Sequence, residues 1–532
     1  MHWLSWEKLV LPKERGGLGF RDLHSFNMAM LAKQGWRLIQ NLDSLCAKIL
    51  KAKYYKNSEL LKASVRDGCS YTWRSILMGV DVLKEGIIWR VGNGQGIYIW
   101  EDPWLPREVT RRPITPKGRT LLRKVADLID PVSDKWDDQL LNQTFWEEDV
   151  KIIKSIPIHV EMGDMIAWHF DKKGRFSVKS AYRVHRDAIL RAQAGSKPGG
   201  ASTSRGDDPF WRKLWKIDCY PKIKHFLWRM CHNTLAVRAV LKRRGMKIDS
   251  RCCMCGRQEE DGAHLMLKCK EVKELWRELH LEGIRLELIK ECSPIQMMTK
   301  IMDLPEEKQI SMVTLLWLWW NEQNRWREEK QRRSGRILAY AVAARADSLK
   351  KSAELSHGAA VSHVKKWIKP TEGTLKINVD GAFSQEIGTG GWGFVIRDEY
   401  GVVRAAGVGS EEALQSAFHA ELIACREGLR IAANLGMPRV SLETDATMVK
   451  AAIEGEDYRL SSMGGIITEI KILKALEFVS CEFLYCPRIC NKLAHELAAM
   501  GCKLPGGTSA TWDSVPQSLE GVVSSDSAVT EE

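Results

Sequence analysis

The sequence predicts a multidomain protein in which an α/β (α+β) domain at residues 371–502, with a mixed five-stranded sheet and flanking helices, follows a mainly helical region with hairpins and a small cysteine-rich unit. Length is the first observation, because 532 residues exceed what one hydrophobic core usually serves. The second is the alternation of period-two apolar runs with helical runs after Thr371. The third is a cluster of cysteine and histidine residues between Cys252 and Cys269.

The composition excludes several classes of protein. With 44% hydrophobic and 28% charged residues, the chain has the balance of a soluble globular protein. Its longest strongly apolar run, MVTLLWLWW at 312–320, is much shorter than the roughly 20 residues a bilayer crossing needs. Residues 1–13 show no secretory signal pattern. We therefore expect an intracellular protein of the nucleus or cytoplasm, not secreted and without a transmembrane segment, whose 14 cysteines are reduced thiols or metal ligands.

The charge is distributed unevenly along the chain. The net charge is +13, but residues 371–532 hold 13 Lys and Arg against 23 Asp and Glu, which leaves an excess of 23 positive charges in residues 1–370. A basic region of this size is either a solvated surface or a partner for phosphate groups. If nucleic acid is the partner, its phosphate contacts should come mainly from residues 1–370.

Two segments before residue 191 carry hairpin patterns. Tryptophan-bearing apolar runs flank Asn93-Gly94, a typical hairpin turn. The glycines at 92, 94 and 96 resemble a phosphate loop, but no helical pattern follows them, so we reject that interpretation. A second expected hairpin, MIAWHFDKKGRFSV at 165–178, precedes a helical run. We assign 1–110 and 111–191 as two successive regions, without a chemistry of their own.

A linker and two further regions lie in the middle of the chain. Residues 192–209 are rich in Gly, Ser and Pro and are predicted to be a linker, in which the triplet Gly-Asp-Asp at 206–208 lacks flanking apolar strands and is interpreted as chance. Residues 210–280 form a compact unit rich in Trp, Lys and Arg, and 281–370 a helical connector. We interpret most of their tryptophans as core residues rather than as base-stacking groups.

Four residues of the 210–280 unit have the spacing of a metal site, C-x2-C-x8-H-x4-C: Cys252, Cys255, His264 and Cys269. Zinc requires four such ligands at the corners of a tetrahedron, and a C-x2-C turn presents two thiolates together. A shell closed by four protein ligands has no open position, so the site should be structural. The alternative is a cluster of reduced, buried cysteines, and Cys253 is a spare thiol that leaves the ligand choice ambiguous.

The 371–502 region alternates strands and helices in a definite order. LKINVDGAF at 375–383 is a period-two strand, and GGWGFVIRDEYGVVRAAG at 390–407 is a hairpin. A long helix follows at 411–436, then the strand RVSLETDA at 439–446, further helices, the strand FVSCEFLYCPR at 478–488 and a last helix. Residues 503–532 are rich in Ser, contain no Lys or Arg beyond Lys503, and are predicted to form a loosely ordered acidic tail.

Three acids stand at special places in this order, and each also has an ordinary explanation. Asp380 ends the first strand, where Asp before Gly is also typical of a turn. Glu421 lies within the first helix and could be an exposed helical acid. Asp445 ends the fourth strand and could be the N-cap of the next helix. Glu443, on the same face as Asp445, is expected to be solvated or to lie behind it.

The front of the chain resembles a known family. FWRKLWKIDCYPKIKHFLWRMCHNTLAVRAVLKRRGM at 210–246, followed by the cysteine pattern, resembles the zinc-binding domain behind the reverse transcriptase of plant non-LTR (LINE-type) retrotransposons. The segments WEKLVLPKERGGLGFRDLHSFNMAMLAKQGWRLIQ, YTWRSIL and WRVGNGQGIYIWEDPWLP resemble the part of that polyprotein after the polymerase. No Tyr or Phe followed by x-Asp-Asp lies on an apolar strand, so we expect a C-terminal part of such a polyprotein without its polymerase domain.

The order of elements at 371–502 resembles the type 1 ribonuclease H fold. That resemblance implies that Asp380, Glu421 and Asp445 are catalytic and hold two divalent metals, Mg²⁺ or Mn²⁺. Paired ions of this kind activate water and stabilise the leaving oxygen during phosphodiester hydrolysis, and Mg²⁺ requires oxygen ligands. The implied activity is endonucleolytic cleavage of the RNA strand of an RNA-DNA hybrid, which also makes the hybrid the implied partner.

His495 departs from the family pattern. It stands where related enzymes have a fourth carboxylate, at the start of the last helix, which Asn491 should cap. Imidazole is a poor ligand for Mg²⁺ and suits Mn²⁺ or Zn²⁺ better, so we expect His495 to be a catalytic metal ligand of a slow, Mn²⁺-preferring nuclease. The alternatives are a catalytically inactive nucleic-acid-binding protein of retrotransposon origin and a protein-interaction scaffold. Protein partners and oligomeric state are not indicated by the sequence.

Overall fold

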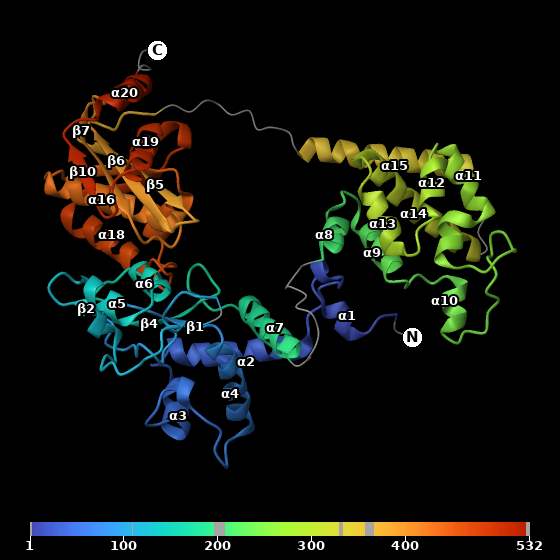
Figure 1. Ribbon diagram of the computed structural model, residues 1–532, viewed down its shortest axis with the longest axis horizontal. Coiled ribbons are helices and arrows are strands. Elements are labelled where there is room, and N and C mark those ends of the chain that lie inside the picture. Colours follow the sequence, from blue (N-terminus) through green and yellow to red (C-terminus); the bar gives the residue numbers. More distant parts are fainter. Residues whose placement is uncertain (1–2, 109, 196–207, 329–332, 357–366, 528–532) are drawn as a thin grey trace. The chain divides into compact units, whose positions relative to one another are not determined.

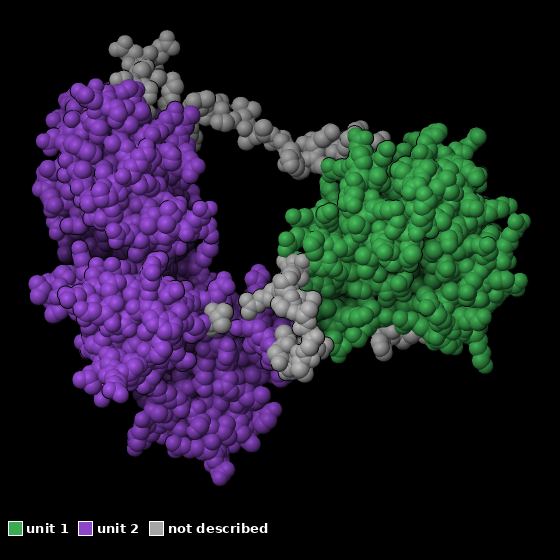
Figure 2. Space-filling view, viewed as in Figure 1, with its two compact units in different colours: residues 1–23, 197–361 green, residues 24–196, 362–532 purple. Residues whose placement is uncertain are grey.

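The chain forms two compact units, each built from two stretches of sequence. The computed structural model describes residues 3–108, 110–195, 208–328, 333–356 and 367–527 (Figure 1). Unit 1 comprises Met1–Leu23 and Lys197–Val361, and unit 2 comprises His24–Ser196 and Ser362–Glu532 (Figure 2). Most of the linker expected at 192–209 lies outside the described residues. Among the helices that the structure describes, none combines the length and apolarity needed to span a membrane.

Unit 1 is helical. Its longest buried element is α14, in which the run MVTLLWLWW lies in the core rather than at the surface. Two indole N–H groups, of Trp319 and Trp276, donate to the carbonyls of Leu265 and Met266 at 2.8 and 3.0 Å. These bonds join the core helices to the cysteine-bearing segment. The helices are α1 (Trp6–Val10), α8 (Pro209–Lys216), α9 (Pro221–Cys231), α10 (Arg238–Arg243), α11 (Lys270–Glu278), α12 (Glu282–Leu288), α13 (Pro294–Met302), α14 (Glu306–Arg327) and α15 (Gly335–Ser356).

The first stretch of unit 2 is mainly helical, with two small two-stranded sheets. Strand β1 pairs antiparallel with β4, and β2 pairs with β3 in a short hairpin. The elements are α2 (Leu23–Gln40), α3 (Leu45–Tyr54), α4 (Tyr71–Lys84), β1 (Ile87–Arg90), β2 (Ile129–Asp130), β3 (Lys135–Trp136), α5 (Asp138–Thr144), α6 (Glu147–Lys154), β4 (Met165–Trp168) and α7 (Val178–Gly195).

Both hairpins expected in this stretch were wrong in their pairing, because β1 and β4 pair with each other across about 75 residues instead of with their own neighbours. The physical reason lies in the glycine run. The backbone N–H groups of Gly92, Gly94 and Gly96 donate to the carboxylate of Asp164, at 2.8, 2.9 and 2.7 Å. Asp164 directly precedes β4, so this bonded loop joins the two strands. The N–H groups of alternate residues therefore form an anion-binding loop here, and the chain's own carboxylate fills it.

The second stretch of unit 2 contains a mixed sheet with the strand order β10-β7-β6-β5-β8-β9. Strands β5, β8 and β9 run parallel to one another, and the remaining pairs are antiparallel. The strands are β5 (Leu375–Ser384), β6 (Thr389–Arg397), β7 (Val403–Glu411), β8 (Arg439–Thr444), β9 (Ser480–Tyr485) and β10 (Ser509–Trp512). The helices are α16 (Ala417–Asn434), α17 (Thr447–Glu454), α18 (Gly464–Glu477), α19 (Lys492–Gly501) and α20 (Glu520–Ser527).

The sheet has a sixth strand in addition to the expected five. Strand β10 lies in the segment that we expected to be a loosely ordered tail, and it pairs along β7 from Ser509 opposite Gly409 to Trp512 opposite Ala406. Ala510 and Trp512 pack against a buried cluster around Val408, which supplies the apolar contact that the acidic, Ser-rich composition of this segment concealed. The α/β domain with a mixed sheet and flanking helices is otherwise confirmed.

Helices cover both faces of this sheet. Helices α16 and α18 pack on the face that carries Ile377 and Val379, and α19 packs on the face that carries Val395. Gly391 and Gly393 of β6 let α19 approach closely. A Cβ on Gly391 would lie 2.4 Å from the backbone nitrogen of Cys502, and a Cβ on Gly393 would lie 2.4 Å from that of Ala498. The packing therefore fixes the second half of α19 against the middle of the sheet.

Candidate functional site

Three acids from separate elements meet beside β5 and β8, two neighbouring strands in the interior of the sheet. Asp380 lies within β5, which continues to Ser384 and does not end at this acid as expected. Glu421 lies near the start of α16, and Asp445 directly after β8. One carboxylate oxygen of each lies within 4.8 Å of the others. At this separation the like charges repel one another unless a proton or a cation lies between them. The group has the composition of a site for a hard divalent cation.

The fold explains why these residues converge. In the parallel pair of β5 and β8, Asn378 lies opposite Glu443, so Asp380 and Asp445 each come two residues further along neighbouring strands. Gly381 then allows α16 to cross β5, because a Cβ there would lie 2.4 Å from the backbone nitrogen of Glu421. Asp380-Gly381, which as an Asp-Gly pair could also have formed a turn, is thus the point where α16 contacts β5.

The electrostatics of the three acids favour a bound cation. Burial, and then the charges of Asp380 and Asp445, raise the pKa of Glu421 to about 9. Burial also raises the pKa of Asp380, against the effect of its hydrogen bond with His495. The Oε2 atom of Glu421 is buried and has no hydrogen-bond partner among the described residues. Because a buried polar atom without a partner is costly, the donor set fits a divalent metal.

His495 lies beside the acids but is not part of the group of three. Its Nδ1 is 2.7 Å from Oδ2 of Asp380, and its side chain is 59% exposed. Asn491 stands at the N-cap position of α19 as expected, but its side chain makes no capping bond. The Asn491 side chain instead donates to the carbonyl of Val379 at 2.8 Å, which ties the start of α19 to β5 next to Asp380.

Sequence reasoning missed the polar residues that support the acids. Arg488 donates to Asp445 at 3.2 Å from the loop after β9. Glu443 is buried rather than solvated: it pairs with Lys376 at 2.7 Å and accepts from Asn378 at 2.9 Å. The period-two pattern of the strands could have indicated these contacts of Glu443. Lys376 and Asn378 lie on the same face of their strand as Asp380, and Glu443 lies on the same face as Asp445.

The cysteine and histidine residues of unit 1 also converge. The Sγ atoms of Cys252 and Cys269 are 3.9 Å apart, and Sγ of Cys255 is 3.4 Å from Nε2 of His264. In a tetrahedral zinc site, two ligand sulfurs are about 3.8 Å apart and a sulfur and a nitrogen about 3.6 Å. The residues present therefore fit a structural zinc ion. Cys253 is not in the group; its Sγ lies 3.6 Å from Glu260.

The surroundings of this cluster orient its ligands. Nδ1 of His264 lies 3.0 Å from Oε1 of Gln258, so Nε2 is the nitrogen that faces the cysteines. A π-helical turn, His264–Lys268, separates His264 from Cys269 and brings both side chains to the same place. Such turns are rare and occur frequently at functional sites.

Two family models match the chain in the expected order. The model described as zinc-binding in reverse transcriptase matches residues 176–276, and the model described as reverse transcriptase-like matches residues 378–501. The first contains the four zinc-ligand candidates, and the second contains the three acids and His495.

The chain is also similar to individual proteins. A protein of Arabidopsis thaliana with a provisional ribonuclease H name is 26% identical over 476 residues, which cover 84% of this chain and 72% of that protein. An uncharacterized mitochondrial protein of the same plant is 40% identical over 113 residues, 21% of this chain and 73% of that protein. Among solved structures, ribonuclease H1 from Halobacterium salinarum NRC-1 is 22% identical, with a TM-score of 0.23, and covers 24% of this chain and 98% of its own.

A zinc-binding domain of the reverse transcriptase type followed by a ribonuclease H-like domain defines a class of retroelement-derived proteins. The chain belongs to a family of plant retrotransposon polyproteins. Its second domain makes it a protein of the ribonuclease H type.

Proposed function

We propose that the protein is an endoribonuclease that cuts the RNA strand of RNA-DNA hybrids. The observation that carries this proposal is the convergence of Asp380, Glu421 and Asp445 with a buried, unpartnered oxygen of Glu421. These residues would hold two divalent ions, Mg²⁺ or Mn²⁺, which activate water and stabilise the leaving oxygen when bound. The negative carboxylates by themselves would repel the scissile phosphate, so the role of the acids is to hold these ions in fixed positions.

The supporting residues have distinct roles in this proposal. Arg488 keeps the Asp445 carboxylate in place through its 3.2 Å bond. His495 holds Oδ2 of Asp380 from the place of the fourth acid. We propose that its ring joins the ligands when metal is bound, and an imidazole ligand favours Mn²⁺ over Mg²⁺. In unit 1, Cys252, Cys255, His264 and Cys269 would hold a structural zinc ion.

Nucleic acid would bind through the basic stretches of the chain. The zinc-bearing part is strongly basic: residues 211–257 contain 13 Lys and Arg against two Asp and Glu. Phosphate attraction of this kind predicts that the logarithm of affinity falls steeply with the logarithm of salt concentration. The solved structure of LC11-RNase H1 is described in complex with an RNA/DNA hybrid, and we propose the same class of partner here.

Cleavage of a hybrid with a labelled RNA strand tests the proposal. The zinc-loaded full chain should cut the RNA in Mn²⁺, and more slowly in Mg²⁺. Asp380→Asn should remove this activity, because it withdraws a ligand charge from the centre of the site. If the wild type cuts no faster than Asp380→Asn in either metal, the protein is not a nuclease.

A second candidate function is nucleic-acid binding without cleavage. The observation that favours it is the 2.7 Å bond between His495 and Asp380, which engages an oxygen that would otherwise bind metal. Titration with Mn²⁺ separates the two functions. A nuclease should be stabilised against heat by Mn²⁺ and should lose this effect in Asp445→Asn, whereas an inactive binder should show little stabilisation in either protein.

A further inference from the structure

The two stretches of unit 2 meet along a junction that contains two adjoining cavities. Lys173 and Arg175, just after β4, pair with Asp457 at 2.8 and 2.6 Å. On the other side, the Gln415 side chain donates to the carbonyl of Ser155 at 2.9 Å. The loop between α17 and α18 is thereby fixed against β1 and β4, and the space left between these contacts is lined by both stretches.

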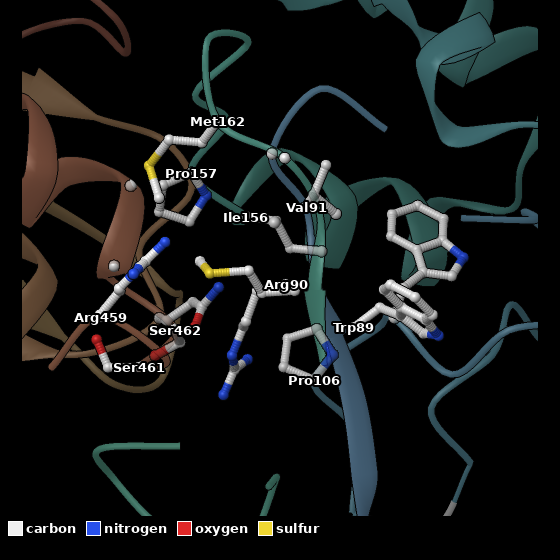
Figure 3. Close-up of a pocket in the computed structure, with 17 residues that line it drawn as sticks. Trp89, Arg90, Val91, Pro106, Ile156, Pro157, Met162, Arg459, Ser461 and Ser462 are labelled. Carbon is white, nitrogen blue, oxygen red and sulfur yellow. The ribbon is translucent and has the colours of Figure 1, made fainter. Parts of the chain in front are cut away.

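The first cavity is small and lined by cationic and hydroxyl groups. The centre of a water-sized sphere can occupy about 20 Å³ of it, so it admits a single small ion or one oxyanion group. In Figure 3, Arg90 reaches it from strand β1 and Arg459 from the opposite side, where Ser461 and Ser462 also lie. Gly464, the first residue of α18, lines the same cavity, and the N-terminus of a helix favours an anion.

Two polar groups in this cavity lack a partner among the described residues: one lacks a hydrogen bond and the other a counter-charge. The Oγ atom of Ser461, a residue only 2% exposed, has no hydrogen-bond partner among the described residues. Arg90 donates from Nε to the carbonyl of Leu460 at 3.1 Å and forms no ion pair within the part of the chain that the structure describes. Burial lowers the pKa of Arg90 to about 10, so the guanidinium stays charged at neutral pH. An anion would satisfy both groups.

The second cavity is an open groove with an aromatic lining. The centre of a water-sized sphere can occupy about 650 Å³ of this groove. Trp36, Trp89 and Phe176 are half-buried along it. Trp36 and Phe176 stack with their ring centroids 5.8 Å apart. Arg459 and Arg175, of which the latter pairs with Asp457, also line the groove. Aromatic walls beside cationic groups are typical of sites where nucleobases stack.

The acids that line the groove are already neutralised within the protein. Three N–H groups bind the carboxylate of Asp164, two cations bind Asp457, and Lys471 pairs with Glu456 at 2.8 Å. Arg459 lines both cavities and, among the described residues, takes part in no ion pair. Trp89 and Met165 also line both cavities, so the groove and the small cavity adjoin. The Arg459 guanidinium therefore lies where the two meet.

We propose that this junction is a binding site for a nucleoside monophosphate group, free or at the end of a nucleic-acid strand. The phosphate would lie in the small cavity against Arg90, Arg459 and Ser461, and the base would lie in the groove against Trp89. This site goes beyond the proposed nuclease function and does not depend on the acid cluster.

The test is a binding titration with the full-length Asp380→Asn protein, in which a failed nuclease does not affect the result. The probes are inorganic phosphate, a nucleoside, the corresponding 5′-monophosphate, and a short single strand with or without a 5′-phosphate. We expect the monophosphate to bind more tightly than either phosphate or nucleoside. Tighter binding of the phosphorylated strand than of the free nucleotide would identify a strand end as the source, and equal binding would identify the free nucleotide.

Three variants check the assignment of residues. Ser461→Ala and Arg459→Ala should each weaken binding of the monophosphate roughly tenfold or more, because each removes a bond to a charged group. Arg439→Ala, which removes an exposed arginine of β8, is the matched control and should leave binding within about twofold. Ser461→Ala also removes an unpaired buried oxygen, so it should not lower the melting temperature. Absence of saturable binding in the millimolar range, equal binding of phosphate and monophosphate, or insensitivity to both variants would overturn the proposal.

Discussion

At the scale of single residues, the acid site consists of three carboxylates and the polar side chains that hold them. Asp380, Glu421 and Asp445 could be selected because the order of elements around them resembles that of type 1 ribonuclease H, and the structure brings their oxygens within 4.8 Å of one another. The bond from His495 to Asp380 joins residues 115 positions apart, and a local pattern carries no information about it. The same is true of Arg488 and Asp445.

His495→Asp is the informative substitution at this scale. It restores a carboxylate at the position where the related enzymes have one and removes a ring that binds Mg²⁺ poorly. We expect Mg²⁺-dependent cleavage of the hybrid to rise on the order of tenfold, which corresponds to about 1.4 kcal/mol of transition-state stabilisation. His495→Asn is the control, because asparagine has the size of aspartate without its charge, and this variant should show no such rise. An equal rate for wild type and His495→Asp in Mg²⁺ would place this residue outside the metal site.

At the scale of elements, period and composition predicted the α/β domain but not the long-range pairings. The strands and helices of 371–502 follow from their alternation, since each buries one face against the same sheet. The pairing of β1 with β4 could not be predicted, because it depends on Asp164 accepting three backbone N–H groups from a loop about 70 residues earlier. Composition likewise concealed β10, whose Trp512 packs against the sheet.

Gly381→Ala tests the crossing of α16 over β5. A Cβ at this position would lie 2.4 Å from backbone atoms of Ala420 and Glu421, so the helix must shift and move Glu421 away from Asp380. We expect a loss of about 1–3 kcal/mol in the free energy of unfolding, measured in urea, together with a large loss of cleavage. Gly521→Ala on α20 meets no atom within 4 Å and should change neither. Unchanged stability and activity of Gly381→Ala would contradict this packing.

At the scale of the whole molecule, the sequence suggested a series of regions, whereas unit 2 is assembled from His24–Ser196 and Ser362–Glu532. Contacts such as the ion pair of Lys173 with Asp457 join positions separated by 284 residues, so no local signal predicts them. The larger part of unit 1, Lys197–Val361, lies between these stretches in the sequence, and unit 1 has a core of its own, which includes Cys252 and Cys269. Zinc should therefore stabilise unit 1 specifically.

Cys269→Ser tests the role of zinc in unit 1. We expect the bound zinc to fall from about one ion per chain to none, measured by atomic absorption after gel filtration, because the ligand shell loses one thiolate. Unit 1 should then unfold at a lower temperature, and limited proteolysis should cut it before unit 2. Cys253→Ser should keep its zinc, since Cys253 faces Glu260 and not the ligand group. Loss of zinc from Cys253→Ser but not from Cys269→Ser would reverse the ligand assignment.

The central claim, that three acids on β5, α16 and β8 form a nuclease site, is tested most directly by the rate of RNA-strand cleavage in Mn²⁺ for Glu421→Gln. Glu482→Gln is the matched control, because Glu482 is exposed on β9 and lies outside the acid group. The claim predicts cleavage by the wild type and by Glu482→Gln, and a loss of at least roughly a hundredfold in Glu421→Gln, because the buried oxygen of Glu421 is a metal ligand. Equal rates for Glu421→Gln and the wild type, or no cleavage by either, would contradict it.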